Sequence, residues 1–392
     1  MKMIDTFLCA AKRALFYIPL VAIAISCSDK GGKTDEDDAE KEAQMSAIVE
    51  QYVDKTVVKT YRSLADESIV LYNALEALKA DKTAAKVEAA AASWVKARDY
   101  WELSEAFLFG AASDFGIDPH IDTWPLAKDE LVAELANDAH IASMAGEEGD
   151  VWVADFLGYA LLGFHGIEYI LFEDGQPKAP NSISDKEIIY AAAVAGDLRN
   201  QCFRLEAAWA GIDNVSSEKK AKIEELEMII TTSSGKLSYG ADMKQAGKAG
   251  STKMSVADAC ETIIEGCITI ADEVGAMKIG MPYTGEDVNY IESPYSFNSK
   301  ADFIGNIISI QNAYLGGVDK NARDASVSAY IKRIDAAVDA DIIAAIDKAL
   351  AAINAIPYPF ARHFTSNEAG AAMDACNDLA EVLTGAKNVL NK

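Results

Sequence analysis

The 392-residue chain contains few cysteines, histidines and prolines. The spacings of its cysteines and histidines exclude several classes of site. There are 6 cysteines, 4 histidines and 9 prolines. The spacings CxxC, HExxH and ExxH are absent, which removes the usual signatures of redox, zinc-protease and paired di-iron sites. Cys260 and Cys267 fall on one predicted helix, where a separation of roughly 10 Å is too long for a disulfide. We predict that the four cysteines after residue 27 are free and buried: Cys202, Cys260, Cys267 and Cys376.

Basic residues are also scarce. Lysine and arginine total 36 against 61 aspartates and glutamates, a net charge of -25. Such an excess of negative charge disfavours nucleic acid and anionic membrane surfaces as partners. No nucleic-acid ligand is therefore expected, whereas cations are attracted.

The one long apolar run lies at the N-terminus. It is "ALFYIPLVAIAI" (14–25), and it follows Lys2, Lys12 and Arg13. This pattern is typical of a secretory signal, and the run is too short to span a bilayer comfortably. The residues "AISC" that end it resemble a bacterial lipobox. We predict a lipoprotein signal peptide over 1–26 and membrane attachment through lipid on Cys27; the alternative is an ordinary secretory signal with a cysteine nearby.

The segment behind Cys27 is acidic, and alanine is its only apolar residue: "SDKGGKTDEDDAEKEAQ" (28–44). A segment with so little to bury predicts a flexible tether over 27–44. Its acidity resembles the export signal of surface-exposed bacterial lipoproteins. We therefore expect an outer-membrane lipoprotein of the bacterial cell envelope, displayed on the cell surface.

The rest of the chain shows helical periodicity and almost no strand pattern. In 331–353, for example, isoleucine, valine and leucine recur every three or four residues, which indicates an amphipathic helix. Similar patterns predict helices over 45–80, 85–109, 150–173, 184–212, 217–232, 254–276, 299–315 and 367–390. The expected fold is all-α, with two four-helix-bundle-like domains packed together. The Gly/Ser/Thr-rich stretch 231–255 places the domains at 45–235 and 236–392.

One predicted helix combines apolar residues with a histidine and a carboxylate. In "GYALLGFHGIEYILFEDG" (158–175), His165 and Glu168 are three residues apart and share a helix face. A helix that is apolar all round is buried, so the pair must be compensated. Three interpretations remain open: a structural ion pair, two metal ligands, or a catalytic pair. Gly163 and Gly166 flank His165 and indicate either a close approach of another backbone or room for a ligand.

Four segments together resemble the imelysin family. "GFHGIEYILF" matches its GxHxxE motif, and "WELSEAFLFG" (101–110) and "IDPHIDTWP" (117–125) match upstream segments. "ESPYSFNSKADFIGNIISIQNAYLGG" (292–317) resembles the family's C-terminal segment. The resemblance implies an all-helical fold of two bundle-like domains in an exported bacterial protein linked to iron or haem acquisition. Imelysins have also been classed as metallopeptidases.

Carried over residue by residue, the resemblance identifies His165 and Glu168 as metal ligands, with Glu105 as the best additional carboxylate. Asp118 and Asp122 are candidates to reach the same region. Arg98 and Glu102 share a helix face with Glu105, and we expect them to form a solvated salt bridge. For Ser293, Tyr295 and Ser296 the resemblance implies the lining of a cleft between the halves. His120, His140 and His363 have no motif support as ligands.

Three functions follow, in order of preference. The first is a lipid-anchored binding protein for iron, zinc, haem or another metal, with His165 and Glu168 in the site. The second is a metal-dependent peptidase acting on surface proteins, in which Glu168 activates a metal-bound water; the chain offers fewer clear ligands than catalytic zinc usually has. The third is a structural or partner-binding lipoprotein in which the pair holds the bundles together.

Overall fold

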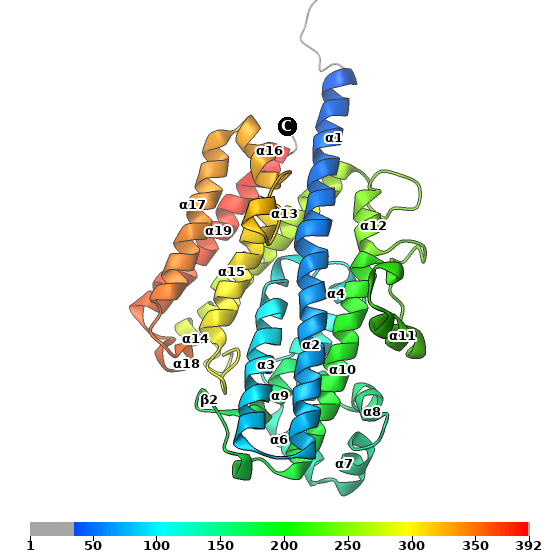
Figure 1. Cartoon of the computed structure of the whole chain (residues 1–392). Helices are drawn as coiled ribbons and strands as arrows, with labels where there is room; N and C mark the ends of the chain where they lie inside the picture. Colours follow the sequence, from blue (N-terminus) through cyan, green and yellow to red (C-terminus); the bar gives the residue numbers. More distant parts are fainter. Residues whose placement is uncertain (1–34, 391–392) are drawn as a thin grey trace, which may run out of the picture.

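The computed structural model describes residues 35–390 as a set of packed helices (Figure 1). The predicted signal peptide and the lipid-bearing Cys27 lie outside the described residues. Within residues 35–390, no helix is both long and apolar enough to cross a membrane.

Four helices of the first half form a closed ring. α1 (Asp35–Tyr52) continues through a π-helical turn, Val53–Val57, into α2 (Val58–Ala80). α2 packs between α3 (Ala84–Glu102) and α10 (Asp185–Ala210). α9 (Gly163–Leu171) closes the ring because it packs against both α3 and α10. The predicted His–Glu pair therefore lies on an inner helix.

The second half forms a similar ring. Its members are α13 (Val256–Asp272), α15 (Ser299–Leu315), α17 (Ala336–Ala355) and α19 (Asn367–Leu390), and each packs against two of the others. The two rings meet where α3 packs on α15 and α1 packs on α13 (Figure 1). This arrangement confirms the all-α fold with two four-helix-bundle-like domains, while the boundary at 235/236 stays a prediction.

The remaining elements are short and connect the long helices. The helices are α4 (Ala111–Asp114), α5 (Ile117–Asp122), α6 (Lys128–Ala136), α7 (Asp138–Met144), α8 (Gly149–Phe156), α11 (Ser217–Glu225), α12 (Tyr239–Lys244), α14 (Gly280–Thr284), α16 (Val327–Ile334) and α18 (Phe360–His363). 3₁₀ turns span Glu105–Phe107, Tyr159–Leu161, Pro180–Ser182, Ile212–Asn214 and Lys320–Ala322, and a second π-helix spans Glu273–Ile279. β1 (Phe172–Glu173) and β2 (Gln176–Pro177) form an antiparallel pair.

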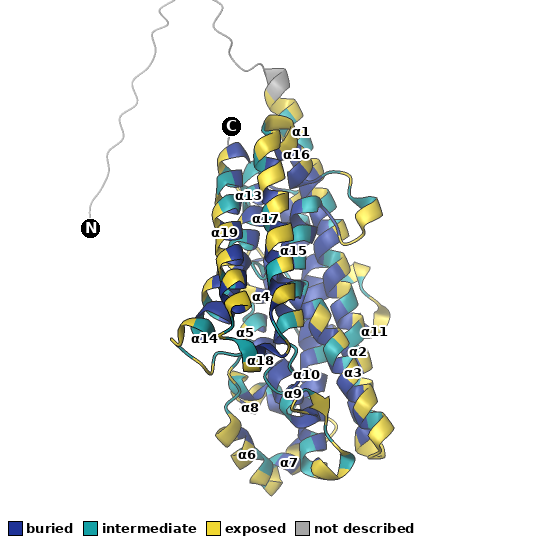
Figure 2. Ribbon diagram, turned by 90° about the vertical axis from the view of Figure 1, so that its left-hand side faces the viewer, coloured by how far each residue is buried: buried dark blue, intermediate teal, exposed yellow. Residues whose placement is uncertain are grey.

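Apolar side chains fill both rings, and Figure 2 shows the buried positions along the inner faces of the long helices. Cys202, Cys260, Cys267 and Cys376 are free and buried, as predicted. Local capping residues fix several helix ends. Ser184 and Glu187, for example, exchange hydrogen bonds in a capping box that starts α10.

Several predicted elements differ from the structure in their extent or continuity. The expected tether over 27–44 is wrong for residues 35–44, which begin α1. These residues include three glutamates, two alanines and one lysine, which favour helix, and the buried Met45 and Ile48 anchor the helix that extends into them. The expected continuous helix over 331–353 is interrupted at Asp335, whose carboxylate accepts hydrogen bonds from the N–H groups of Ala337 and Val338 and so starts α17.

The helix predicted over 150–173 is also interrupted, and a glycine marks the break. α8 ends at Phe156, and α9 begins only at Gly163, where φ is 67°. A Cβ on Gly163 would lie 1.8 Å from the carbonyl oxygen of Ile121, and one on Gly166 would lie 2.3 Å from the hydroxyl of Tyr190. Gly163 therefore permits the close approach of another backbone, one of the two predicted alternatives, whereas Gly166 makes room for a side chain.

Gly163→Ala should destabilise the protein severely. The left-handed backbone costs an alanine roughly 1–2 kcal/mol, and the contact with Ile121 adds to this, so we expect a loss of more than about 2 kcal/mol in the free energy of unfolding by urea. The matched control is Gly385→Ala in α19, where a Cβ meets no atom within 4 Å. That change should be neutral or stabilising by up to about 1 kcal/mol. Equal effects of the two substitutions would contradict this account of Gly163.

Candidate functional site

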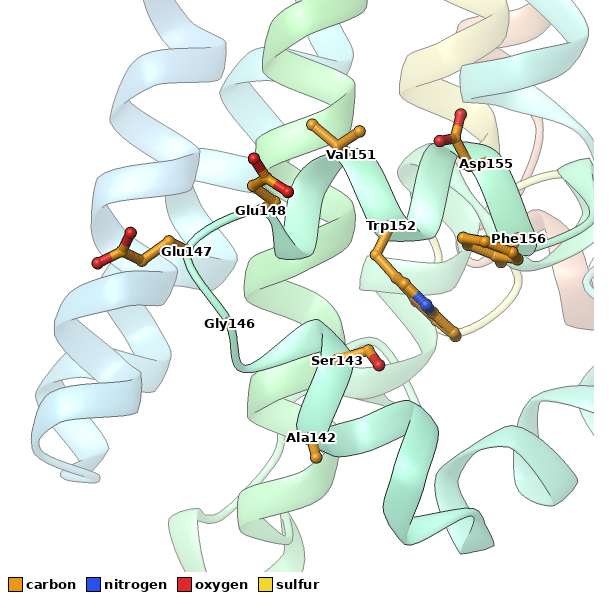
Figure 3. Close-up of a pocket in the computed structure, with 9 residues that line it drawn as sticks. All are labelled: Ala142, Ser143, Gly146, Glu147, Glu148, Val151, Trp152, Asp155 and Phe156. Atoms are coloured by element: carbon orange, nitrogen blue, oxygen red, sulfur yellow. The ribbon is translucent and has the colours of Figure 1, made fainter.

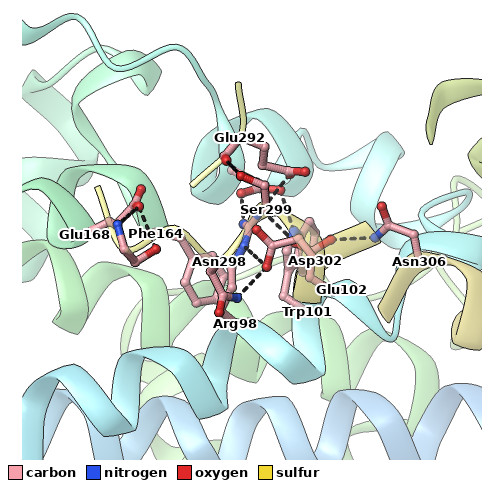
Figure 4. Close-up of polar contacts among 12 residues, drawn as sticks. Arg98, Trp101, Glu102, Phe164, Glu168, Glu292, Asn298, Ser299, Asp302 and Asn306 are labelled. Atoms are coloured by element: carbon pink, nitrogen blue, oxygen red, sulfur yellow. Dashed lines mark hydrogen bonds and ion pairs between the residues drawn. The ribbon is translucent and has the colours of Figure 1, made fainter. Parts of the chain in front are cut away.

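A buried cluster of charged side chains lies where the two rings meet (Figure 4). α3, α5, α9 and the turn after α3 contribute to it from the first half; the π-helix Glu273–Ile279, the loop before α15 and α15 itself contribute from the second half. No member is more than 8% exposed. The members are Arg98, Glu102, Glu105, Asp122, His165, Glu168, Lys278, Glu292 and Asp302.

His165 is held between two carboxylates. Its Nδ1 lies 3.2 Å from Oε2 of Glu168, and its Nε2 lies 3.2 Å from Oδ1 of Asp122. Burial alone would lower the pKa of the imidazole, but the hydrogen bonds to Asp122 and Glu168 raise the pKa to about 9. His165 is therefore an imidazolium at neutral pH in the ion-free protein, and the prediction that it contacts Glu168 is confirmed.

Glu168 joins the two halves of the chain. Its Oε1 accepts hydrogen bonds from the backbone N–H groups of Tyr295 and Ser296, at 2.9 and 2.8 Å, and from the Ser296 hydroxyl at 2.7 Å. Ser293 lies beside them and is fully buried. The sequence predicted that Ser293, Tyr295 and Ser296 line a cleft. Instead, Tyr295 and Ser296 donate hydrogen bonds to one oxygen of Glu168. Glu168 thereby fixes both the loop and the orientation of His165.

Arg98 lies at the centre of the cluster. Its Nη2 lies 2.6 Å from Glu102 Oε1 and 2.7 Å from Glu292 Oε1, and its Nη1 contacts Asp122. Both Arg98 and Glu102 are buried, at 0% and 1% exposed, so the expectation of a solvated salt bridge is wrong. The i, i+4 spacing was correct, but this face of α3 is covered by the other half of the chain.

Lys278 brings a second cation from the π-helix. Its Nζ lies 3.2 Å from Glu292 Oε1, but 3.8 Å from Glu105 Oε2 and 3.9 Å from Glu102 Oε2. No sequence pattern predicted Lys278, Glu292 or Asp302 as site residues. Lys278 lies in the mainly apolar stretch "VGAMKIGMP" (274–282), and a charge in such a stretch was the only signal that could have identified it.

The cluster contains more acid than base. Six carboxyl groups face Arg98, Lys278 and His165, which leaves three more carboxyls than positive charges even when His165 is protonated. Burial raises the pKa of Glu102 and Glu105 well above the usual range, despite attraction to Arg98 and Lys278, respectively. Burial opposes ionisation of Asp122 too, but attraction to Arg98 and the hydrogen bond from His165 lower its pKa. Protons or another cation must balance the excess.

Two sets of these side chains have ligand atoms within 4.8 Å of one another: Asp122, His165 and Glu292, and Glu102, Glu105 and Asp122. Imidazole and carboxylate donors suit iron or zinc, so both groups are compatible with a metal. The predicted combination of His165, Glu168 and Glu105 is not one set. Glu168 belongs to neither set, and its contact is with the imidazole of His165. Glu105 belongs to the second set, with Glu102 and Asp122, and not to the set that contains His165.

Several oxygens in this region lack partners. Oε2 of Glu292, Oδ2 of Asp302 and Oδ1 of Asn306 are buried without a hydrogen bond from any described residue. Unsatisfied buried acceptors are uncommon, because each loses the hydrogen bonds that water would have provided. They leave the cluster with acceptor capacity for a cation or a water molecule.

The other candidate residues lie outside the cluster. Asp118 lines a cavity beside it, together with Glu105. His120 pairs with Asp197 and His140 pairs with Glu134. A surface pocket of about 560 Å³ between α7 and α8 is lined by Trp152, Phe156 and nearby acids (Figure 3), and it includes no member of the cluster.

Removing the central cation should be far more damaging than removing an exposed one. Arg98→Met leaves four carboxyl groups without their guanidinium, so we expect a loss of about 3–5 kcal/mol in the free energy of unfolding by urea. The control is Lys348→Met, which breaks an exposed pair with Asp378. It should cost no more than about 1 kcal/mol. Comparable losses in the two variants would be inconsistent with the central role of Arg98.

The stabilising effect of His165 should depend on pH. Its pKa rises on folding from about 6.5 to about 9, so its contribution is complete below pH 6.5 and is lost as the pH rises through 9. The difference in unfolding free energy between the wild type and His165→Gln, in chelator, should therefore shrink by at most about 3 kcal/mol between pH 6 and 9.5. A difference that stays flat or grows over this range would rule out a buried imidazolium.

The chain is similar to known proteins along most of its length. The model of the family described as Imelysin, peptidase M75, matches residues 57–385. Iron-regulated protein A of Synechococcus elongatus is 28% identical over 268 residues, which are 68% of this chain and 64% of that protein. The match thus spans less than two thirds of the relative's length.

Solved structures extend the comparison to the fold. A Parabacteroides distasonis protein, named as a candidate precursor of iron-regulated protein A, is 29% identical with a TM-score of 0.75, covering 89% of this chain and 95% of that one. An imelysin-like protein from Psychrobacter arcticum, 12% identical with a TM-score of 0.55 and covering 89% and 93%, shares the fold alone. The GxHxxE segment, the two helical rings and the family match over residues 57–385 lead to one conclusion: the chain belongs to the imelysin family.

Proposed function

We propose that the protein binds a metal cation, with iron as the first candidate, at a buried centre formed by Asp122, His165 and Glu292. The observation that carries this proposal is the convergence of these three ligand groups within 4.8 Å in a cluster with excess acid. The imelysin family and the relative named iron-regulated protein A fit a role in iron uptake. Because His165 is an imidazolium in the ion-free protein, binding would release its proton, and a divalent ion would add one net positive charge to the cluster.

The residues around the centre support a bare ion over haem. His165 is 2% exposed and has a carboxylate against each ring nitrogen. A haem would need the space that these neighbours occupy. Glu168 would not be a ligand; it would orient the imidazole from behind, as carboxylates do for many metal-binding histidines.

A peptidase fits these contacts less well. A general base must reach a water beside the substrate, but Glu168 is fully buried, and its Oε1 already accepts three hydrogen bonds. A surface-protein substrate has no access to it in this arrangement. Peptidase activity therefore ranks below binding.

A second candidate is an architectural role, favoured by the position of Glu168. Its Oε1 accepts three hydrogen bonds, all from Tyr295 and Ser296 in the second half of the chain. Its Oε2 faces His165. The pair thus ties the first half of the chain to the second. In both candidates the body would be anchored to the outer membrane through lipid on Cys27.

Calorimetric titration of the mature protein with Fe²⁺, Zn²⁺ and haem tests the proposal. We expect Fe²⁺ or Zn²⁺ to bind and haem not to bind. His165→Ala should weaken metal binding at least about 100-fold, because the imidazole is one of three ligands. His140→Ala, which removes a histidine paired with Glu134 near the surface, should leave binding unchanged.

Absence of metal binding by the wild type would refute the binding proposal. If His165→Ala then lost most of its resistance to urea, the architectural role would be the better description. If, instead, the wild type binds metal and His165→Ala is stable but has lost the metal, the binding role would be established.

A further inference from the structure

A second feature lies against the buried cluster: a cavity of about 560 Å³ between the two halves of the chain. Its walls come from the turn after α3, from α4 and α5, and from α13 and the π-helix that follows. Part of the wall is apolar, including Leu108, Phe109 and Ile270. The cavity is large enough for a hydrated ion and is not used by the contacts described above.

The charged residues of this cavity are all acidic. Glu105, Asp118, Glu265 and Glu273 line it, and no lysine or arginine does. Glu265 is paired with Lys387 at the surface. The other three form an inner wall of carboxyl groups. Burial raises the pKa of Glu105 and of Glu273, and it raises the pKa of Asp118 to about 7, so a cation entering from solvent would displace protons from these oxygens.

Glu105 is the buried member of this wall. Its side chain is 3% exposed and accepts no hydrogen bond from any described residue. Its only ion-pair contact within residues 35–390 is the one with Lys278, at 3.8 Å, which is longer than a hydrogen bond. A carboxyl group so deeply buried and so weakly held has oxygen available for a ligand in the cavity.

Glu105 also connects the cavity to the proposed centre. Its ligand atom lies within 4.8 Å of those of Glu102 and Asp122, and Asp122 in turn belongs to the set with His165 and Glu292. Carboxylate oxygens therefore continue from the cavity wall to the imidazole without a gap longer than 4.8 Å at either step. A cation moving along this series would always have oxygen ligands within reach.

Lys278 is positioned at the point where the two sets meet. It donates one hydrogen bond, to Glu292, and faces Glu105 and Glu102 only at 3.8 and 3.9 Å. It lies in a π-helix, a rare element that is often found at functional sites. Its buried ammonium group provides positive charge at the place where the two sets of carboxyls meet.

We infer that this acidic cavity is the entrance for the metal ion: a first station for a hydrated divalent cation, from which Glu105 passes the ion to Asp122, His165 and Glu292. The inference rests on the proposed function, since an entrance has a role only if the centre binds an ion. In this inference Asp118 and Glu273 capture the cation from solvent, and Glu105 transfers it to the centre.

Stopped-flow measurement of Fe²⁺ binding under anaerobic conditions tests the inference. Trp101 is one of five tryptophans and donates a hydrogen bond to Asp122, so the part of the fluorescence change that is lost in Trp101→Phe reports arrival at the centre. The double variant Asp118→Asn, Glu273→Gln should reduce the association rate constant about tenfold at low ionic strength. The final fluorescence change should stay that of the wild type, and the rate difference should disappear in roughly 1 M salt.

The control removes the same charge elsewhere. Asp341→Asn with Glu381→Gln changes two acids of a different surface pocket, lined by α17 and α19, and should leave the rate constant within about twofold of the wild type. Thr269→Lys gives an independent variant in case the double variant does not fold. This exposed helical residue lines the cavity, and lysine there should also slow association.

The outcomes separate the two proposals. If the cavity variants bind Fe²⁺ at the wild-type rate, or if the control is slowed as much as they are, the entrance is wrong and the centre stands. If wild-type protein binds neither Fe²⁺ nor Zn²⁺ by calorimetry, the centre itself is wrong.

Discussion

The guanidinium of Arg98 is the group on which the polar interior depends. It is fully buried and lies among Glu102, Asp122, Glu292 and Asp302. These carboxyls come from α3, α5, the loop before α15 and α15 itself, so one cation joins elements from both halves of the chain. Without it, mutual repulsion and the loss of hydration would drive the carboxyls apart.

The second tie between the halves is Glu168, and it works without a positive partner from the other half. Backbone N–H groups of Tyr295 and Ser296 converge on one of its oxygens, while His165 occupies the other. Arg98 and Glu168 together fix the position of the two halves relative to each other around Asp122. The same contacts position the side chains of the proposed centre, so stability and the proposed cation binding depend on one set of residues.

Excess acid is what distinguishes this cluster from an ordinary buried ion pair. A balanced pair needs nothing further, whereas here three carboxyls remain beyond the available positive charges. Burial raises the pKa of Asp302 to about 6, despite its attraction to Arg98. The acidic cavity beside Glu105 adds a path by which a cation could reach the same groups.

The sequence by itself determined the properties that depend on local pattern. Helical periodicity predicted the long helices, and the apolar surroundings of His165 and Glu168 predicted a buried pair. Gly163 and Gly166 predicted either a close backbone approach or room for a ligand. Tertiary structure decided the rest. The sequence predicted a solvated pair for Arg98 and Glu102, because i, i+4 spacing is the same on an exposed and on a covered helix face. Only the packing of α3 on α15 covers the face that carries these two residues. Lys278 and Glu292 join the site because distant segments meet there, and no local pattern records which segments will meet.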